Sequence, residues 1–423
     1  MSEVDSAQSD AGIKITGLQW FFLRSKNPVY FAIHIPRVIT AAKFYELVNW
    51  VLTEIPSLSS IYDRNTETFR SDCSVKVAQT CEYHKVEDLS ACWNQFLGEL
   101  PLLFDNLDGR LFRATCFVSS DDADETDASG ESLVMFAALH AVIEGVDLAN
   151  VLRGKFESGE SRQLGPAKLL SRTSARNAFY ALTGILIVVS SHILARARRR
   201  PSIFPAVQHI SLERQGLRNL AREYGVSQKA LLFALVRHSL NQIEPQTNRL
   251  GWGRRVSLTY TEHAQATQSQ DDEAIKMRLR SGLLDVRGNI KDLAEKFDAM
   301  FSRKHKKPHV FQRTNNAAIR INRILEKIFP KLYGEQMFDY LPFSECYTLL
   351  PPNRFRANLS EMSDGTLLTG SMSRGLDVIT FCPSRKRIHI AFKTEPARAR
   401  VTEICLDTLK QLGLSADQTA LEF

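Results

Sequence analysis

His140 follows an unbroken apolar run, residues 133–139 (LVMFAAL), and polar residues appear soon after it, at positions 144, 145 and 147. An apolar run without polar alternation predicts a strand that is covered on both faces. The histidine then stands where a buried strand ends, so that rigid secondary structure can fix its imidazole. Such a histidine could serve as a general base, because its ordinary pKa lies near neutrality. The sequence around it also fits a core histidine whose nitrogens bond to the backbone.

The six residues HAVIEG (140–145) resemble the HxxxDG motif of the coenzyme A-dependent acyltransferases related to chloramphenicol acetyltransferase. That superfamily also contains the condensation domains of peptide synthetases and the bacterial wax ester synthase/diacylglycerol acyltransferases. The resemblance implies that His140 is the base that deprotonates the acceptor. It also implies that Glu144 and Gly145 are structural at the active site, with Glu144 paired to an arginine. Two positions differ from the motif: Glu144 replaces aspartate, and Leu139 stands where many members carry a second histidine.

Other stretches resemble the same family at low similarity. QWFFL (19–23) with residues 30–36 and the helix-like 41–52 resembles the family's opening strand and first helix. The other stretches are FD (104–105) before GRLFR (109–113) and the segment around GVSQKA (225–230). The resemblance implies an α/β fold of two chloramphenicol acetyltransferase-like subdomains, with mixed sheets flanked by helices and a central channel. We expect these subdomains at residues 1–155 and 206–423, joined by an apolar and basic linker at 156–205.

Hydrophobic periodicity predicts the elements of both halves. In the first half it predicts amphipathic helices at 40–54 and 86–100. In the second half it predicts a strand at 207–210, a helix that begins at Leu212, and a largely apolar helix capped by Ser227. Further strands are expected at 255–261, 366–373, 376–383 and 387–392, before a closing helix at 401–412. The resemblance implies that part of the last group of strands crosses over to the first subdomain.

Composition limits the class of protein. With 423 residues and 44% hydrophobic content, the chain is long enough for two domains with cores of their own. Its seven cysteines are odd in number and contain no CxxC pair, which indicates neither a disulfide framework nor a zinc cluster. Residues 1–10 are polar and acidic, unlike a secretory signal, so we expect a cytoplasmic protein.

The net charge of +7 is unevenly distributed, with basic clusters at 196–200 and 303–307 and an acidic run at 121–131. Such runs are usually solvated surface, but basic clusters could also attract lipid head groups or the phosphates of a thioester donor. No nucleic-acid-binding module accompanies the charge. Residues 181–195 (ALTGILIVVSSHILA) fall short of the about 20 apolar residues that span a bilayer. The stretch 181–200 is either a helix docked on the body or an interfacial anchor that makes the protein a peripheral membrane protein.

Two other candidate sites are rejected on sequence grounds. His305 and His309 have the spacing of helical metal ligands, but Pro308 interrupts the helix and the flanking lysines would repel a cation, so we expect no metal site. Cys346 lies near two hydroxyl residues, but no GxSxG elbow surrounds them, which argues against covalent catalysis.

The resemblance implies an acyltransferase that binds no resident cofactor and uses an acyl-coenzyme A or acyl-carrier-protein thioester as donor. The acceptor would be a hydroxyl of a lipid-like or small molecule, which would place the protein in lipid metabolism. Two alternatives remain open: an amide-forming, condensation-type enzyme that works with a carrier protein, and a catalytically silent binding member of the same fold.

Overall fold

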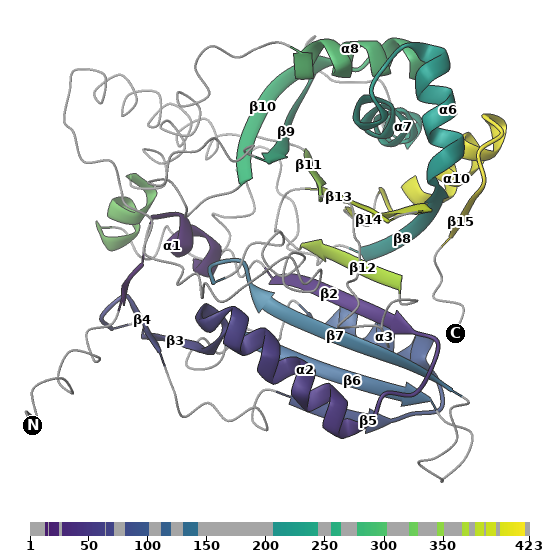
Figure 1. The fold of residues 1–423 in the computed structure, drawn as a ribbon. Helices are drawn as coiled ribbons and strands as arrows, with labels where there is room; N and C mark the ends of the chain where they lie inside the picture. Colours follow the sequence, from purple (N-terminus) through teal and green to yellow (C-terminus); the bar gives the residue numbers. More distant parts are fainter. Residues whose placement is uncertain are drawn as a thin grey trace, which may run out of the picture.

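The computed structural model describes residues 13–15, 17–24, 28–63, 65–71, 81–100, 111–119, 130–142, 206–243, 255–263, 277–302, 321–328, 345–350, 366–371, 377–384, 386–394 and 398–418 of the chain. These residues form two lobes, each built on a mixed sheet (Figure 1).

The first lobe contains a five-stranded sheet with the strand order β12-β2-β7-β6-β5. Its strands are β2 (Pro28–Ile35), β5 (Cys81–Lys85), β6 (Phe112–Ser119), β7 (Glu131–Leu139) and β12 (Thr366–Ser371). β7 lies in the middle, antiparallel to β2 and β6, and its residues 132–139 are all buried. The expected strand covered on both faces is therefore confirmed.

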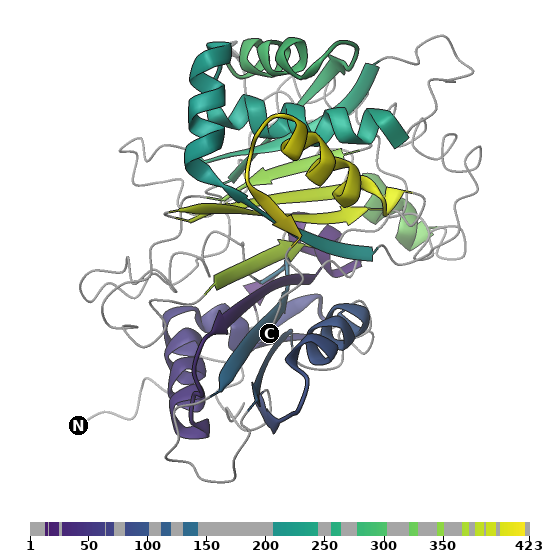
Figure 2. The ribbon, with the colours of Figure 1, turned by 90° about the vertical axis from the view of Figure 1, so that its right-hand side faces the viewer.

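Two helices cover opposite faces of this sheet, α2 (Ala41–Glu54) and α3 (Leu89–Glu99) (Figures 1 and 2). Thr40 and Asp88 cap them, each accepting a hydrogen bond from the backbone N–H three residues later, and so satisfy a free donor of the first turn. A short 3₁₀ helix, η1 (Pro56–Ser59), follows α2. Both predicted helices of the first half are present, slightly shorter than expected.

The second lobe contains a seven-stranded sheet with the order β10-β9-β11-β13-β14-β8-β15. Its strands are β8 (Ala206–Glu213), β9 (Arg255–His263), β10 (Met277–Asp285), β11 (Glu345–Leu349), β13 (Asp377–Pro383), β14 (Arg387–Thr394) and β15 (Ala416–Gln418). The helices of this lobe lie on the side of the sheet away from the first lobe (Figures 1 and 2). They are α6 (Arg214–Tyr224), α7 (Gln228–Ile243), α8 (Ile290–Ser302) and α10 (Val401–Gln411).

α7 is the central helix of the second lobe. Its residues 230–237 are buried without interruption, the pattern of a helix that is packed on all sides. Ser227 accepts a hydrogen bond from the backbone N–H of Ala230, which confirms the predicted cap. α8 and α10 both pack against α7.

β12 connects the lobes, because it follows most of the second lobe in sequence yet pairs antiparallel with β2 of the first lobe. The expected crossover is therefore confirmed. Gly370 of β12 lies opposite Tyr30 of β2, and a Cβ atom at position 370 would stand 2.4 Å from the Tyr30 hydroxyl oxygen. A glycine is needed there because the tyrosine ring occupies the space of a side chain.

A smaller layer lies at one side of the first lobe. It contains a three-stranded sheet, β1 (Ile13–Lys14), β4 (Thr68–Ser71) and β3 (Ser60–Asp63), and the helix α1 (Gly17–Arg24). A helix at residues 321–328 docks there through Arg24–Glu326, at 2.5 Å, and Arg323–Glu67 ion pairs. A segment from the second half of the chain thus packs on the first lobe.

Two sequence-based expectations were wrong in detail. The aromatic segment 19–23 lies in the helix α1, whereas its resemblance to the family's opening strand implied a strand there. Leu212 belongs to β8 rather than to a helix, because it is buried on the second-lobe core in alternation with Ile210, and α6 begins only at Arg214. The subdomain bounds remain predictions, and the linker 156–205 and His305 and His309 lie outside the described residues.

Candidate functional site

His140 is the first residue after β7, and three hydrogen bonds fix the backbone around it. The N–H of Leu139 donates to the carbonyl of Leu111 at 2.9 Å, and the N–H of Val142 donates to the carbonyl of Leu139 at 3.0 Å. The hydroxyl of Ser57 then donates to the carbonyl of Val142 at 2.7 Å. The turn that carries the histidine is therefore held from both sides.

The imidazole of His140 is only partly buried, and it stacks on the ring of Phe22. The ring centroids are 4.2 Å apart and the planes differ by 6°. Phe22 belongs to α1, which lies beside the end of β7 in Figure 1. One face of the imidazole is thereby covered and Nδ1 is buried, so a substrate must approach Nε2, from the ring edge or from the other face.

This edge of the first sheet is also where the chain passes between the lobes. Leu139 pairs with Pro28, and the neighbouring Val29 pairs with Ser371, the last residue of β12. The ends of β7 and β12 and the start of β2 therefore share the edge that carries His140. From Ser371 the chain enters the second sheet at Asp377.

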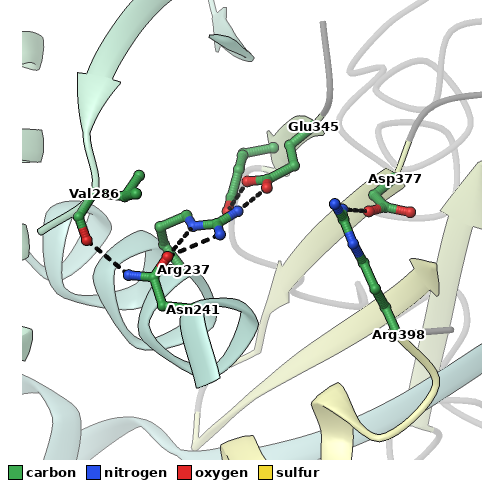
Figure 3. A network of polar contacts seen from close by, with 7 residues as sticks. Arg237, Asn241, Val286, Glu345, Asp377 and Arg398 are labelled. Carbon is green, nitrogen blue, oxygen red and sulfur yellow. Dashed lines mark hydrogen bonds and ion pairs between the residues drawn. The ribbon is translucent and has the colours of Figure 1, made fainter. Parts of the chain in front are cut away.

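The second sheet has two arginine–carboxylate pairs at the starts of adjacent strands (Figure 3). Glu345 opens β11 and Asp377 opens β13, and the two residues are partners in the parallel register. Glu345 pairs with Arg237 of α7, and Asp377 pairs with Arg398, which precedes α10. These carboxylates stand side by side, each neutralised by its own arginine.

Further hydrogen bonds surround the Arg237–Glu345 pair, whose side chains are fully buried. Asn241 accepts from Nε and Nη2 of Arg237 at 3.0 and 2.8 Å, and its own amide donates to the carbonyl of Val286 at 2.7 Å. The Tyr347 hydroxyl donates to the second oxygen of Glu345 at 2.7 Å. Such complete bonding is what a buried charge requires.

A separate polar contact joins the first lobe to the second. The hydroxyl of Tyr30 in β2 lies 3.0 Å from Nε2 of His209 in β8, and both side chains are buried against Trp93 of α3. Burial, and secondarily the nearby His389, lowers the pKa of His209 from 6.5 to about 3. Burial and then Arg387 lower the pKa of His389 to about 4, and burial raises the pKa of Tyr30. The contact is therefore one between neutral side chains at physiological pH.

The structure places only one of the three predicted site residues. His140 is described, whereas Glu144 and Gly145 lie outside the described residues, and their expected roles remain predictions. Both arginines of Figure 3 already have a carboxylate partner in this structure.

The sequence alone did not indicate the two ion pairs or the Tyr30–His209 contact. Arg237 stands inside the apolar run ALLFALVRHSL, and that position was a usable signal because a charge on a buried helix needs a partner. Nothing local could identify that partner, since Glu345 is 108 positions away.

In the described part of the chain, no helix is long and apolar enough to cross a membrane. The same residues contain no cluster of three or more histidine, cysteine, aspartate or glutamate side chains that could hold a metal ion. The candidate anchor at 181–200 falls outside this part.

No model of a known protein family matches the sequence, and no curated protein is significantly similar to it. Solved structures, by contrast, match over nearly the whole chain. TRI3 trichothecene 15-O-acetyltransferase from Fusarium sporotrichioides has a TM-score of 0.65 at 9% identity, over 97% of both chains. The wax ester synthase/diacylglycerol acyltransferase from Marinobacter aquaeolei VT8 has a TM-score of 0.56 at 10% identity, over 95% of this chain and 98% of that one.

The first condensation domain of the CDA synthetase has a TM-score of 0.55 at 13% identity, over 95% of this chain and 98% of that one. At such low identities the likeness concerns the fold, and all three structures have the architecture that the HAVIEG resemblance implied. The chain therefore has the two-lobed α/β fold that these acyltransferases and condensation domains share.

Proposed function

We propose that this protein is an acyltransferase that moves an acyl group from a coenzyme A or carrier-protein thioester to a hydroxyl of a lipid-like or small-molecule acceptor. His140 is the general base. The observation that carries the proposal is the fixed position of this histidine, at the edge of the first sheet where the chain crosses between the lobes. A base held in place by the backbone supports catalysis because positioning supplies much of the rate enhancement.

In the proposed reaction an imidazole nitrogen of His140 accepts the proton of the acceptor hydroxyl. The oxygen attacks the thioester carbonyl, a C–O bond forms, the C–S bond breaks, and the proton is returned to the departing thiolate. General-base assistance of this kind contributes about 10²–10⁴ in rate. The stack on Phe22 holds the ring during both proton transfers.

The fold is compatible with both acceptor classes, since it occurs in an O-acetyltransferase and in a condensation domain. The alternative of amide formation is decided by the same assay, with amines offered in place of alcohols.

The test measures thiol release and acylated product from a panel of acyl-coenzyme A and acyl-carrier-protein thioesters with mixed alcohol and amine acceptors. His140→Ala is expected to lower product formation by about 10²–10⁴. His34→Ala is the matched control, since His34 lies at the opposite end of the same sheet, where it pairs with Glu131. Equal rates in wild type and His140→Ala would contradict the role of His140, and no transfer from any donor would favour the catalytically silent alternative.

Phe22→Ala tests the stack separately. We expect a lower kcat with little change in the KM for the thioester, and we expect Phe22→Tyr to restore most of the kcat because it keeps the ring.

A further inference from the structure

The two ion pairs of Figure 3 are alike in chemistry but differ in how their strands are connected to the crossover strand: β13 comes directly after β12 in the chain, whereas β11 comes before it. Both carboxylates belong to the first residue of a strand, and the two strands are parallel neighbours in register. Asp377 is 3% exposed and Glu345 is fully buried, so neither charge would be stable without its arginine.

Asp377 lies on the crossover between the lobes. β12 ends at Ser371 in the first sheet, and β13 begins at Asp377 in the second, so only residues 372–376 connect them. Six Cα–Cα steps cover at most about 20 Å, which makes the connection a short tether. β12 also contacts β13 and β14 of the second sheet directly, so a movement of these strands acts on β12, and β12 is hydrogen-bonded to β2 at the edge that carries His140.

Arg398 fixes Asp377 within the second lobe. The guanidinium bonds the carboxylate of Asp377, and the carbonyl of Arg398 lies 3.5 Å from the hydroxyl of the buried Thr394. α10 begins three residues later and packs on α7. The pair thus joins the start of β13 to the helical layer of the second lobe.

We propose that Asp377 and Arg398 are positioning residues that anchor the second-lobe end of the β12 crossover and so hold the second lobe in place against the His140 edge. Neither residue contacts the reacting atoms. Their catalytic effect rests on the proposed function, whereas the anchoring is a property of the fold and can be measured without any substrate.

The experiment uses double variants that remove both charges of a pair and leave no buried charge unpaired. Asp377→Asn with Arg398→Gln removes the anchor. Arg237→Gln with Glu345→Gln is the matched control, because it removes a buried pair at the same level of the neighbouring strand β11, which lacks the short connection (372–376) that joins the end of β12 to β13. Arg398→Lys is the conservative variant, since lysine keeps a charge for Asp377.

Backbone amide exchange followed by mass spectrometry is the first readout. The anchor variant is expected to raise exchange at least severalfold in peptides from β12 and from the start of β2, while the control variant raises it only within the second lobe. Unchanged exchange in β12, or an equal rise in both variants, would overturn the anchoring.

The second readout is the ratio of acyl transfer to thioester hydrolysis, measured at a temperature at which every variant is folded. A misplacement of about 1 Å can cost about 10²-fold in rate. We expect the anchor variant to lower this ratio about 10- to 100-fold with little change in thioester KM, and Arg398→Lys to recover much of it. A purely structural role would lower the amount of folded enzyme but leave the ratio per folded molecule unchanged, and that result would refute the positioning role. Failure of the proposed function itself is recognised separately, by transfer that does not depend on His140.

Discussion

The stability of the protein should fall in mild acid because two histidines are buried in the neutral form. His209 and His389 lie on adjacent strands of the second sheet, and burial lowers their pKa values from 6.5 to about 3 and about 4. As the pH falls, a histidine whose pKa is lower in the folded protein takes up its proton at a higher pH in the unfolded chain than in the folded protein. Stability is therefore complete above pH 6.5 and is lost as the pH falls toward the folded-state values.

The loss of unfolding free energy can be calculated from the pH range over which only the unfolded chain is protonated. One pKa unit corresponds to about 1.4 kcal/mol, so between pH 7.5 and pH 5.0 each of the two histidines removes about 2 kcal/mol of unfolding free energy. His209→Gln keeps an amide that can bond the Tyr30 hydroxyl but cannot take up the proton. The variant should therefore lose about 2 kcal/mol less than wild type over the same pH change.

The assay is urea denaturation at pH 7.5 and pH 5.0 for wild type, His209→Gln and the control His84→Gln. His84 is the control because its side chain is 47% exposed on β5, so its replacement removes a histidine that is not buried. Other titrating groups are common to all three proteins and cancel in the comparison. If His209→Gln and wild type lost the same free energy between the two pH values, the assignment of a buried neutral imidazole at position 209 would be refuted.

Two further predictions concern packing and charge. Gly370→Ala should cost about 1–3 kcal/mol in thermal or urea denaturation, because the new Cβ would stand 2.4 Å from the Tyr30 hydroxyl oxygen. Gly98→Ala is its control, since a Cβ there meets nothing within 4 Å, and it should stabilise α3 by about 0.5–1 kcal/mol. Glu345→Ala should cost about 3–5 kcal/mol by leaving Arg237 charged and buried. A loss below about 1 kcal/mol in that variant would show that the pair is not buried as described.

Sequence patterns predicted most elements whose signal is local. The run before His140, the apolar helix α7 and the strands β13 and β14 all carry periodicities or runs that physical burial produces directly. The error at α1 has a physical cause. Its aromatic residues favour strands by propensity. Trp20 and Leu23, however, are three positions apart and both buried in the first-lobe core, and a helix places residues at this spacing on one face. Packing against the core therefore outweighs the propensity.

Of the candidate site, only the residues of the motif at 140–145 could be predicted from the sequence. His140 could be found because its strand and its neighbours in the motif are contiguous in sequence. Its stacking partner Phe22 is more than 100 positions away, and the Tyr30–His209 pair spans 179. Contacts of this kind depend on tertiary packing between distant segments, which one sequence does not encode in any local pattern.

The distribution of polar residues over the second sheet explains why those inter-lobe contacts matter. On β14, Ile388, Ile390 and Phe392 belong to the core beneath the helices, whereas His389 and Lys393 alternate with them and point to the other face, toward the first lobe. Among the side chains that the structure describes, the apolar residues of the two lobes accordingly form two separate core clusters, and few residues of the second sheet join the first cluster. The relative position of the lobes therefore depends also on the Tyr30–His209 contact and on the pairing of β12 with β2. We therefore expect substitutions at the Tyr30–His209 contact or at the start of β13 to alter the geometry around His140 by shifting one lobe against the other.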